Sequence, residues 1–157
     1  MEIRVTPFDD ADAVKLIAEV QQEYVARYGS QDVTPTDPAE FAPPKGLFLV
    51  GYLDSVPVAC GGWRAQDGPA PHHHPGDVEL KRMYVVSSVR GKGFARGILA
   101  ELERTAAAAG RTRAMLVTGV EQPEALGLYR SSGYRRIPSF GLYKEDPRSV
   151  CFEKDLG

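Results

Sequence analysis

The sequence VELKRMYVVSSVRGKGFARGILAEL, residues 78–102, decides the fold because it joins a strand, a glycine-rich turn and a helix. Its first part, about Val78 to Val86, is rich in valine and predicts a strand. Its last part predicts a helix, which Gly110 ends and whose apolar stripe is Ile98, Leu102, Ala106 and Ala109. The turn therefore lies directly between the end of a strand and the start of a helix.

The turn Arg90-Gly91-Lys92-Gly93 brings free backbone amides and positive charge to one point. A helix start presents amides without intrahelical partners, and its dipole adds partial positive charge. Glycines allow close approach, while Arg90, Lys92 and Arg96 add full charges, so the pattern predicts a phosphate or pyrophosphate site. The alternative is a surface turn with solvated basic residues. The Gly-Lys-Ser/Thr ending of nucleotide loops and the glycine spacing of dinucleotide folds are both missing.

The rest of the chain predicts strands and helices around this unit. A first helix, capped by Asp9 or Asp10 and ending near Gly29, has an expected apolar face of Val14, Ile17, Val20, Tyr24 and Tyr28. A third helix begins at Pro123, ends at Gly133 and turns Leu126 and Tyr129 inward. The other expected strands are Ile3–Val5, Leu47–Leu53, Val56–Ala65, Ala114–Thr118, Tyr134–Ile137 and Val150–Leu156. Two proline-rich loops, residues 35–44 and 69–75, separate elements of one mixed sheet with helices packed on it.

Composition indicates an ordinary globular chain. The 157 residues, 43% of them hydrophobic and 25% charged, predict a single domain over residues 1–157. A formal charge of −2 gives no general attraction to nucleic acid or membranes, and apolar runs such as residues 47–50 are too short to cross a bilayer. The N-terminal residues lack the apolar core of a secretory signal, and Cys60 and Cys151 make no disulfide framework. We therefore expect a cytoplasmic protein.

The segment from Val78 to Tyr134 resembles the GNAT superfamily of acyl-coenzyme A N-acyltransferases. Its motif Arg/Gln-x-x-Gly-x-Gly/Ala is matched by Arg90, Gly93 and Ala95, and residues 79–86 resemble the family's central strand. Residues 125–134, ALGLYRSSGY, resemble its later helix and the Gly-aromatic pair that follows. The resemblance implies an α/β (α+β) fold with a mixed, mostly antiparallel sheet of six to seven strands and three to four helices on its faces.

The resemblance also implies a co-substrate, acetyl-coenzyme A, and the residues that bind it. The pyrophosphate would lie on the amides of Arg90, Gly91, Lys92, Gly93, Phe94, Ala95 and Arg96. The pantetheine arm would pair with the backbone of the central strand like an added β-strand, with contacts from Met83, Tyr84 and Val85. Many family members carry asparagine near the start of the later helix, where Gln122 stands here.

Acyl transfer to an amine needs a neutral amine, a polarised thioester carbonyl and a proton for the leaving thiolate. Glu79, four residues before Met83, is the candidate base, and its alternative is a carboxylate paired with Lys81 or Arg82. Tyr129 is the candidate acid, and its alternative is a core aromatic. The amide of Met83 would hold the thioester oxygen.

Other side chains carry weaker hypotheses. His72, His73 and His74 between prolines are interpreted as a mobile loop rather than a metal site, so no metal is expected. Cys60 and Cys151 are interpreted as inert buried thiols, and Trp63 as either core or acceptor site.

The predicted function is direct acetyl transfer from acetyl-CoA to a primary amine of a small molecule in a ternary complex. The alternatives are a catalytically silent acyl-CoA-binding regulatory module and a protein N-terminal or lysine acetyltransferase. The acceptor pocket is expected at the first helix, the Ser30 to Lys45 loop and the last strands. A further hypothesis, compatible with this function, is homodimerisation through the exposed end strands.

Overall fold

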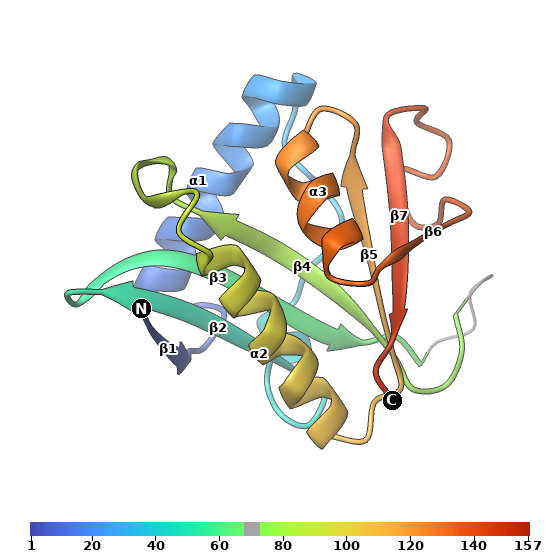
Figure 1. Cartoon of the computed structure of the whole chain (residues 1–157), viewed down its shortest axis with the longest axis horizontal. Coiled ribbons are helices and arrows are strands. Elements are labelled where there is room, and N and C mark those ends of the chain that lie inside the picture. The colour runs from blue at the N-terminus through green and yellow to red at the C-terminus, as the bar shows by residue number, and fades with distance from the viewer. Residues whose placement is uncertain (68–72) are drawn as a thin grey trace.

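The fold, a computed structural model that describes residues 1–67 and 73–157, is built on one seven-stranded sheet (Figure 1). The strand order is β1-β2-β3-β4-β5-β7-β6. Only β4 and β5 pair in parallel, whereas all other neighbours pair antiparallel. The strands are β1 (Glu2–Val5), β2 (Gly46–Leu53), β3 (Val56–Ala65), β4 (Asp77–Val85), β5 (Arg113–Gly119), β6 (Arg135–Ile137) and β7 (Ser149–Asp155). This confirms the predicted mixed, mostly antiparallel sheet.

Three α-helices cover the two faces of this sheet: α1 (Ala11–Tyr28), α2 (Phe94–Ala108) and α3 (Pro123–Ser131). Residues of α2 and α3 belong to the larger core cluster on one face, with β3 to β5. Residues of α1 belong to a second cluster with β2 and Phe41, on the opposite face. Phe41 lies in a short 3-10 helix, η1 (Pro38–Phe41), and a second one, η2 (Ser87–Val89), precedes the glycine turn.

The predicted apolar face of α1 is partly wrong. The residues of this helix with buried side chains are Ala13, Leu16 and Val20, whereas Val14 is 52% exposed. The same spacing continues four residues beyond Val20 to Tyr24, which is half-buried. The helix therefore packs on the sheet as far as Val20, and its C-terminal part lies beyond this packed region.

Helix ends follow local chemistry. The Asp10 side chain accepts a hydrogen bond from the Asp12 amide and caps α1, and Gly29 ends it with a left-handed φ of 85°. Cys60, Cys151 and Trp63 are all buried, and the indole of Trp63 donates to the Thr105 hydroxyl, which makes Trp63 a core residue.

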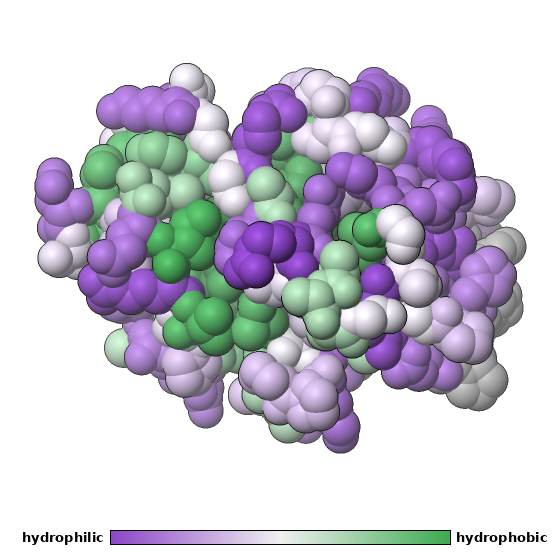
Figure 2. All heavy atoms as spheres, turned by 60° about the horizontal axis from the view of Figure 1, so that its bottom comes forward, coloured by the Kyte–Doolittle hydropathy of each residue, from purple (hydrophilic) through white to green (hydrophobic). Residues whose placement is uncertain are grey.

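The face seen in Figure 2 mixes hydrophobic and hydrophilic groups, with the apolar groups gathered mainly in its left half. Among the described residues, no helix has the length and hydrophobicity that a bilayer crossing demands.

Candidate active site

The parallel strands β4 and β5 pair only at their beginning and then diverge (Figure 1). Asp77 to Leu80 pair with Arg113 to Leu116. Beyond these residues β4 continues to Val85 and β5 to Gly119, and the two strands no longer pair with each other. A cavity of about 450 Å³ opens there. It is lined by the diverging parts of both strands, the glycine turn, the start of α2, α3, the end of α1 and residues 30–32.

A β-bulge in β4 shapes the cavity wall. Opposite β3, Cys60 pairs with Tyr84 and Gly62 with Lys81, so Arg82 and Met83 together face Gly61. Arg82 adopts a left-handed φ of 60°, which is rare outside glycine.

Beyond the bulge, β4 offers backbone groups to the cavity. The Val86 amide donates to the Val58 carbonyl of β3 at 2.9 Å, so by alternation the amide and carbonyl of Val85 face away from β3. Arg90 Nε donates to that Val85 carbonyl at 2.9 Å. Met83 and Val85 thus line a strand edge that an extended chain could join.

The glycine turn presents an uncapped helix start. Gly91 and Gly93 have left-handed φ values of 79° and 82°, and a Cβ at either would meet nothing within 4 Å. Gly93 is the N-cap of α2, and no side chain caps this helix start. The first amides of α2 therefore face open space at the cavity, which fits a pyrophosphate.

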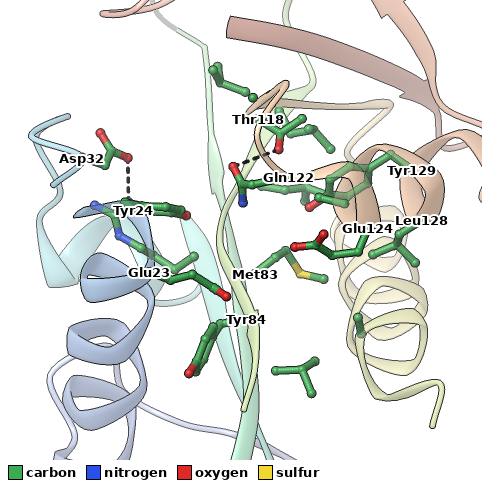
Figure 3. A pocket seen from close by; sticks show the side chains of 18 of the residues that line it. Glu23, Tyr24, Asp32, Met83, Tyr84, Thr118, Gln122, Glu124, Leu128 and Tyr129 are labelled. Atoms are coloured by element: carbon green, nitrogen blue, oxygen red, sulfur yellow. Dashed lines mark hydrogen bonds and ion pairs between the residues drawn. The ribbon is translucent and has the colours of Figure 1, made fainter. Parts of the chain in front are cut away.

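Most predicted cofactor residues come together at the cavity. Those lining it are Met83, Tyr84, Val85, Arg90, Gly91, Gly93, Phe94, Ala95, Arg96 and Gln122. Lys92, also a described residue, does not line it. The Gln122 amide oxygen accepts from the hydroxyls of Tyr28, at 3.1 Å, and Thr118, at 3.4 Å, so it is held at the start of α3 (Figure 3).

Tyr129 lines the same cavity from α3 (Figure 3). Its ring lies against Tyr134 and Phe152, with centroid distances of 5.5 and 6.0 Å, and the residue is 5% exposed. Burial raises the pKa of the phenol above its ordinary value, so the hydroxyl stays protonated at neutral pH. Within residues 1–67 and 73–157 no group hydrogen-bonds to this hydroxyl.

The structure does not bring Glu79 to this cavity. Its carboxylate is buried and accepts from Arg64 Nε and Nη2, at 3.0 and 2.8 Å, and from the Gln66 amide at 3.0 Å. It points to the opposite side of β4 from the core residues Val78 and Leu80. The interpretation of Glu79 as the base is therefore corrected, and so is its alternative, since its partner is Arg64 rather than Lys81 or Arg82.

The sequence predicts an acceptor pocket at the first helix, residues 30–45 and the last strands, but it does not identify the side chains that line this half of the cavity. Figure 3 shows Glu23, Tyr24 and Asp32 on one side and Glu124 on the other, with Met83 between them. Part of this half could be predicted, because Tyr24 and Tyr28 continue the helical spacing of Val20, and both line the cavity. Asp32 carries no such signal, since it lies in an irregular loop.

Cys60 and Cys151 take no part in the cavity. Neither lines it, and burial raises the pKa of both thiols. Over the described part of the chain, no group of three or more His, Cys, Asp or Glu side chains could hold a metal ion. His72 of the predicted histidine loop lies outside the described residues.

A sheet opened between its parallel strands, with a glycine turn at the start of the next helix, is the arrangement that the resemblance to acyl-CoA N-acyltransferases implies. The family model described as Acetyltransferase (GNAT) family matches residues 14–134, and the chain belongs to this family of acetyltransferases.

Relatives agree with this assignment. The chain is 34% identical over 153 residues to an IAA acetyltransferase of Azospirillum brasilense, covering 98% of this chain and 95% of the relative. It is 28% identical to a Klebsiella pneumoniae crystal structure proposed to be an acyl-CoA N-acyltransferase, with a TM-score of 0.78, 99% of this chain covered and 97% of the other. The fold also matches the PaiA N-acetyltransferase of Thermoplasma acidophilum in complex with coenzyme A, with 16% identity, a TM-score of 0.67 and 99% of each chain covered.

Proposed function

We propose that this protein transfers an acetyl group from acetyl-CoA to a primary amine of a small molecule, directly and within a ternary complex. One observation carries the proposal: a single cavity holds both the uncapped start of α2 and a polar half lined by α1 and residues 30–32. A thioester carrier and an acceptor would therefore meet at Met83, where β4 divides the two halves.

The pyrophosphate of the carrier would accept hydrogen bonds from the first amides of α2, with Arg90 and Arg96 adding positive charge. Arg96 is preorganised by the Ser131 and Ser132 hydroxyls at 2.8 and 3.1 Å. The pantetheine arm would pair with Met83 and Val85 as an added strand. The coenzyme A complex of the Thermoplasma relative supports this use of the fold.

In the chemical step the amine nitrogen attacks the thioester carbonyl, the C–S bond breaks, and the sulfur leaves as a thiolate. Deprotonating an alkyl ammonium at pH 7 costs roughly 4 to 5 kcal/mol, so a proton acceptor is needed. With Glu79 elsewhere, the carboxylates of Glu23 and Glu124 are the ones that point towards Met83 (Figure 3). Either would take the proton through a water molecule, and Tyr129 would protonate the thiolate.

Direct transfer is supported by the placement of the thiols. An acyl-enzyme would need a reactive nucleophile at the thioester, and both cysteines are buried outside the cavity with raised pKa values. Free buried cysteines also suit a reducing compartment, which supports a cytoplasmic location.

The small-molecule acceptor is supported by the Azospirillum relative, whose name gives IAA as its substrate. Structural relatives below 25% identity act on several kinds of acceptor by name, including an aminoglycoside and a ribosomal protein, and they do not separate these classes.

Thermal-shift titration with acetyl-CoA and free CoA, followed by a thiol-release assay on an amine panel, tests the proposal. We expect both to raise the melting temperature and at least one small amine to release CoA. Binding of acetyl-CoA without turnover on any small amine or lysine peptide would instead identify a silent regulatory module. Turnover on peptides alone would identify a protein acetyltransferase.

A further inference from the structure

The bulge in β4 places two consecutive cations on the same face of the strand. In a regular strand Lys81 and Arg82 would point to opposite faces. Here Lys81 Nζ and Arg82 Nη1 both donate to the same atom, Asp32 Oδ2, at 3.1 and 2.7 Å. Both residues line the acceptor half of the cavity, next to Met83.

This cluster of three residues carries an excess positive charge. Burial alone would raise the pKa of Asp32, but Lys81, the Thr34 amide and Arg82 outweigh it and hold the pKa well below its usual range. Asp32 is therefore a full anion at neutral pH, and it balances only one of the two cations.

The other carboxylates of the cavity are engaged elsewhere. Glu23 pairs with Arg27 and Arg90, at 3.2 and 2.8 Å, and Glu124 pairs with Arg27. Asp146 pairs with Arg148 at 2.9 Å. The cluster of Lys81, Arg82 and Asp32 thus keeps a net charge of +1 next to Met83, because the other carboxylates that line the cavity pair with other arginines.

The guanidinium of Arg82 also has unused donors. The residue is 5% exposed, and its Nε has no hydrogen-bond partner among the described residues. Among the described residues, Asp32 is the only side chain to which its terminal nitrogens donate a hydrogen bond, through Nη1. Buried donors are almost always paired, because an unpaired one loses its hydration without compensation. A buried cation that lines a cavity and keeps free donors indicates an anionic ligand.

We propose, resting on the acetyl transfer proposed above, that the acceptor carries a carboxylate beside its primary amine and that Lys81 and Arg82 bind this carboxylate. The single excess charge matches a monoanion better than a phosphate, which carries nearly two charges at neutral pH. Lys81 and Arg82 directly precede Met83, and consecutive Cα atoms lie about 3.8 Å apart. An α-amino acid bound at this pair would therefore keep its nitrogen near a thioester at Met83.

The substrate test compares each amino acid with its own amide, for example leucine with leucinamide and phenylalanine with phenylalaninamide. The amide keeps the amine and the side chain but lacks the negative charge. The amine of the amide is less basic than that of the amino acid, so a larger fraction of it is neutral at a given pH. This difference alone would favour the amide as substrate. We expect kcat/KM for thiol release to be about 10- to 100-fold higher for the amino acids, as charge-assisted hydrogen bonds predict.

The variant test uses Lys81→Met, with Lys15→Met as its matched control. Lys15 lies on α1 with its side chain 58% exposed and outside the cavity, so its loss removes the same charge without touching the acceptor. Lys81→Met should reduce the preference for amino acids over their amides at least several-fold, mainly through a higher KM for the amino acids. Lys15→Met should keep the full preference. Arg82→Lys keeps the charge but removes the planar fork, and should also reduce the preference.

Melting temperatures and acetyl-CoA binding of each variant show whether it is folded. Equal kcat/KM for amino acids and amides in the native protein would overturn this inference and leave the proposed acetyl transfer standing. An unchanged preference in folded Lys81→Met and Arg82→Lys would also overturn it. Acetyl-CoA binding without turnover of any amine would overturn both proposals.

Discussion

Tyr129 combines two properties that rarely occur together, a buried ring and a hydroxyl without a hydrogen-bond partner among the described residues. Its aromatic neighbours fix the ring, and burial raises the pKa of the phenol. Tyr129→Phe should therefore lower kcat by about 100-fold or more, the usual contribution of a general acid. The affinity for acetyl-CoA should stay nearly constant, because the change removes one oxygen and leaves the ring in place. Steady-state thiol release and thermal-shift titration measure the two quantities.

Tyr134→Phe is the matched control for this prediction. The Tyr134 ring contacts that of Tyr129, but its hydroxyl donates to Glu103 at 2.8 Å and the residue does not line the cavity. This variant should lose some stability and keep its turnover. Similar kcat values for the two phenylalanine variants would contradict the acid role of Tyr129.

The pH dependence of turnover follows from the direction of the same pKa shift. Because the pKa of Tyr129 lies above its ordinary value of about 10, the proton is retained as the pH rises to 10. Over that range more of the acceptor amine becomes neutral. In a kcat/KM profile from pH 6 to 10 we expect a rise to a plateau, with no decrease before pH 10. A fall of kcat/KM between pH 8 and 9.5 would show that a group with a lower pKa supplies the proton.

At the scale of elements, Glu79 joins two strands. It lies directly opposite Arg64 in the β3–β4 ladder, and this arginine also donates to the Pro35 carbonyl and to Glu40 of η1, at 2.8 and 3.1 Å. Glu79→Gln should lower the free energy of unfolding by about 2 kcal/mol, since the buried guanidinium of Arg64 loses the more buried of its two carboxylate partners. The kcat of this variant should change less than threefold. Urea denaturation curves and steady-state turnover, recorded on the same preparation, measure the two quantities. A large loss of kcat with unchanged stability would return the base role to Glu79.

The start and the end of α2 provide a matched pair of glycines. Gly93 and Gly110 both have a φ of 82°, and a Cβ at either position would meet no atom within 4 Å. Alanine at either position should thus cost about 1 kcal/mol of stability, through backbone strain alone. Only Gly93→Ala should weaken CoA binding, because Gly93 orients the amides at the cavity and Gly110 does not line it. Denaturation midpoints and CoA titrations of both variants check this, and equal CoA affinities would contradict the pyrophosphate site.

The same elements show what the sequence could predict. Strand and helix positions followed from spacing, and the glycine turn followed from its motif, because both are local properties. The side of β4 on which each side chain lies could not be predicted in the same way. Regular alternation puts Lys81 and Arg82 on opposite sides of the strand, and only the bulge brings them together. Glu79 was misplaced for a related reason: its partner Arg64 lies 15 residues earlier in the chain.

At the scale of the whole molecule, the cavity depends on where β4 and β5 stay joined. Asp77, fully buried at the start of β4, accepts from Arg113 Nε and Nη2 of β5 at 2.8 and 2.6 Å. Arg113 Nη1 also donates to Glu153 of β7 at 2.6 Å, and Arg135 of β6 donates to the same carboxylate at 2.8 Å. These ion pairs hold four strands together at the closed end of the divergence.

This network gives the stability of the protein a definite dependence on acid. Burial alone would raise the pKa values of Asp77 and Glu153, but the arginines outweigh it and lower both. A lowered pKa means that the stabilisation is complete above the ordinary values near 4 and is lost as the pH falls below them. Urea midpoints recorded from pH 7 to 3 should therefore decrease towards pH 3. Asp77→Asn should lower the free energy of unfolding by about 3 kcal/mol at pH 7, and its urea midpoint should decrease less steeply towards pH 3.

Asp67→Asn is the control for this prediction. It removes a carboxylate that pairs with Arg111 and whose side chain is 57% exposed. Its free energy of unfolding should stay within about 0.5 kcal/mol of the native value, and its urea midpoint should keep the native dependence on acid. If Asp77→Asn kept the native dependence as well, Asp77 would not be one of the carboxylates that give the fold its dependence on acid.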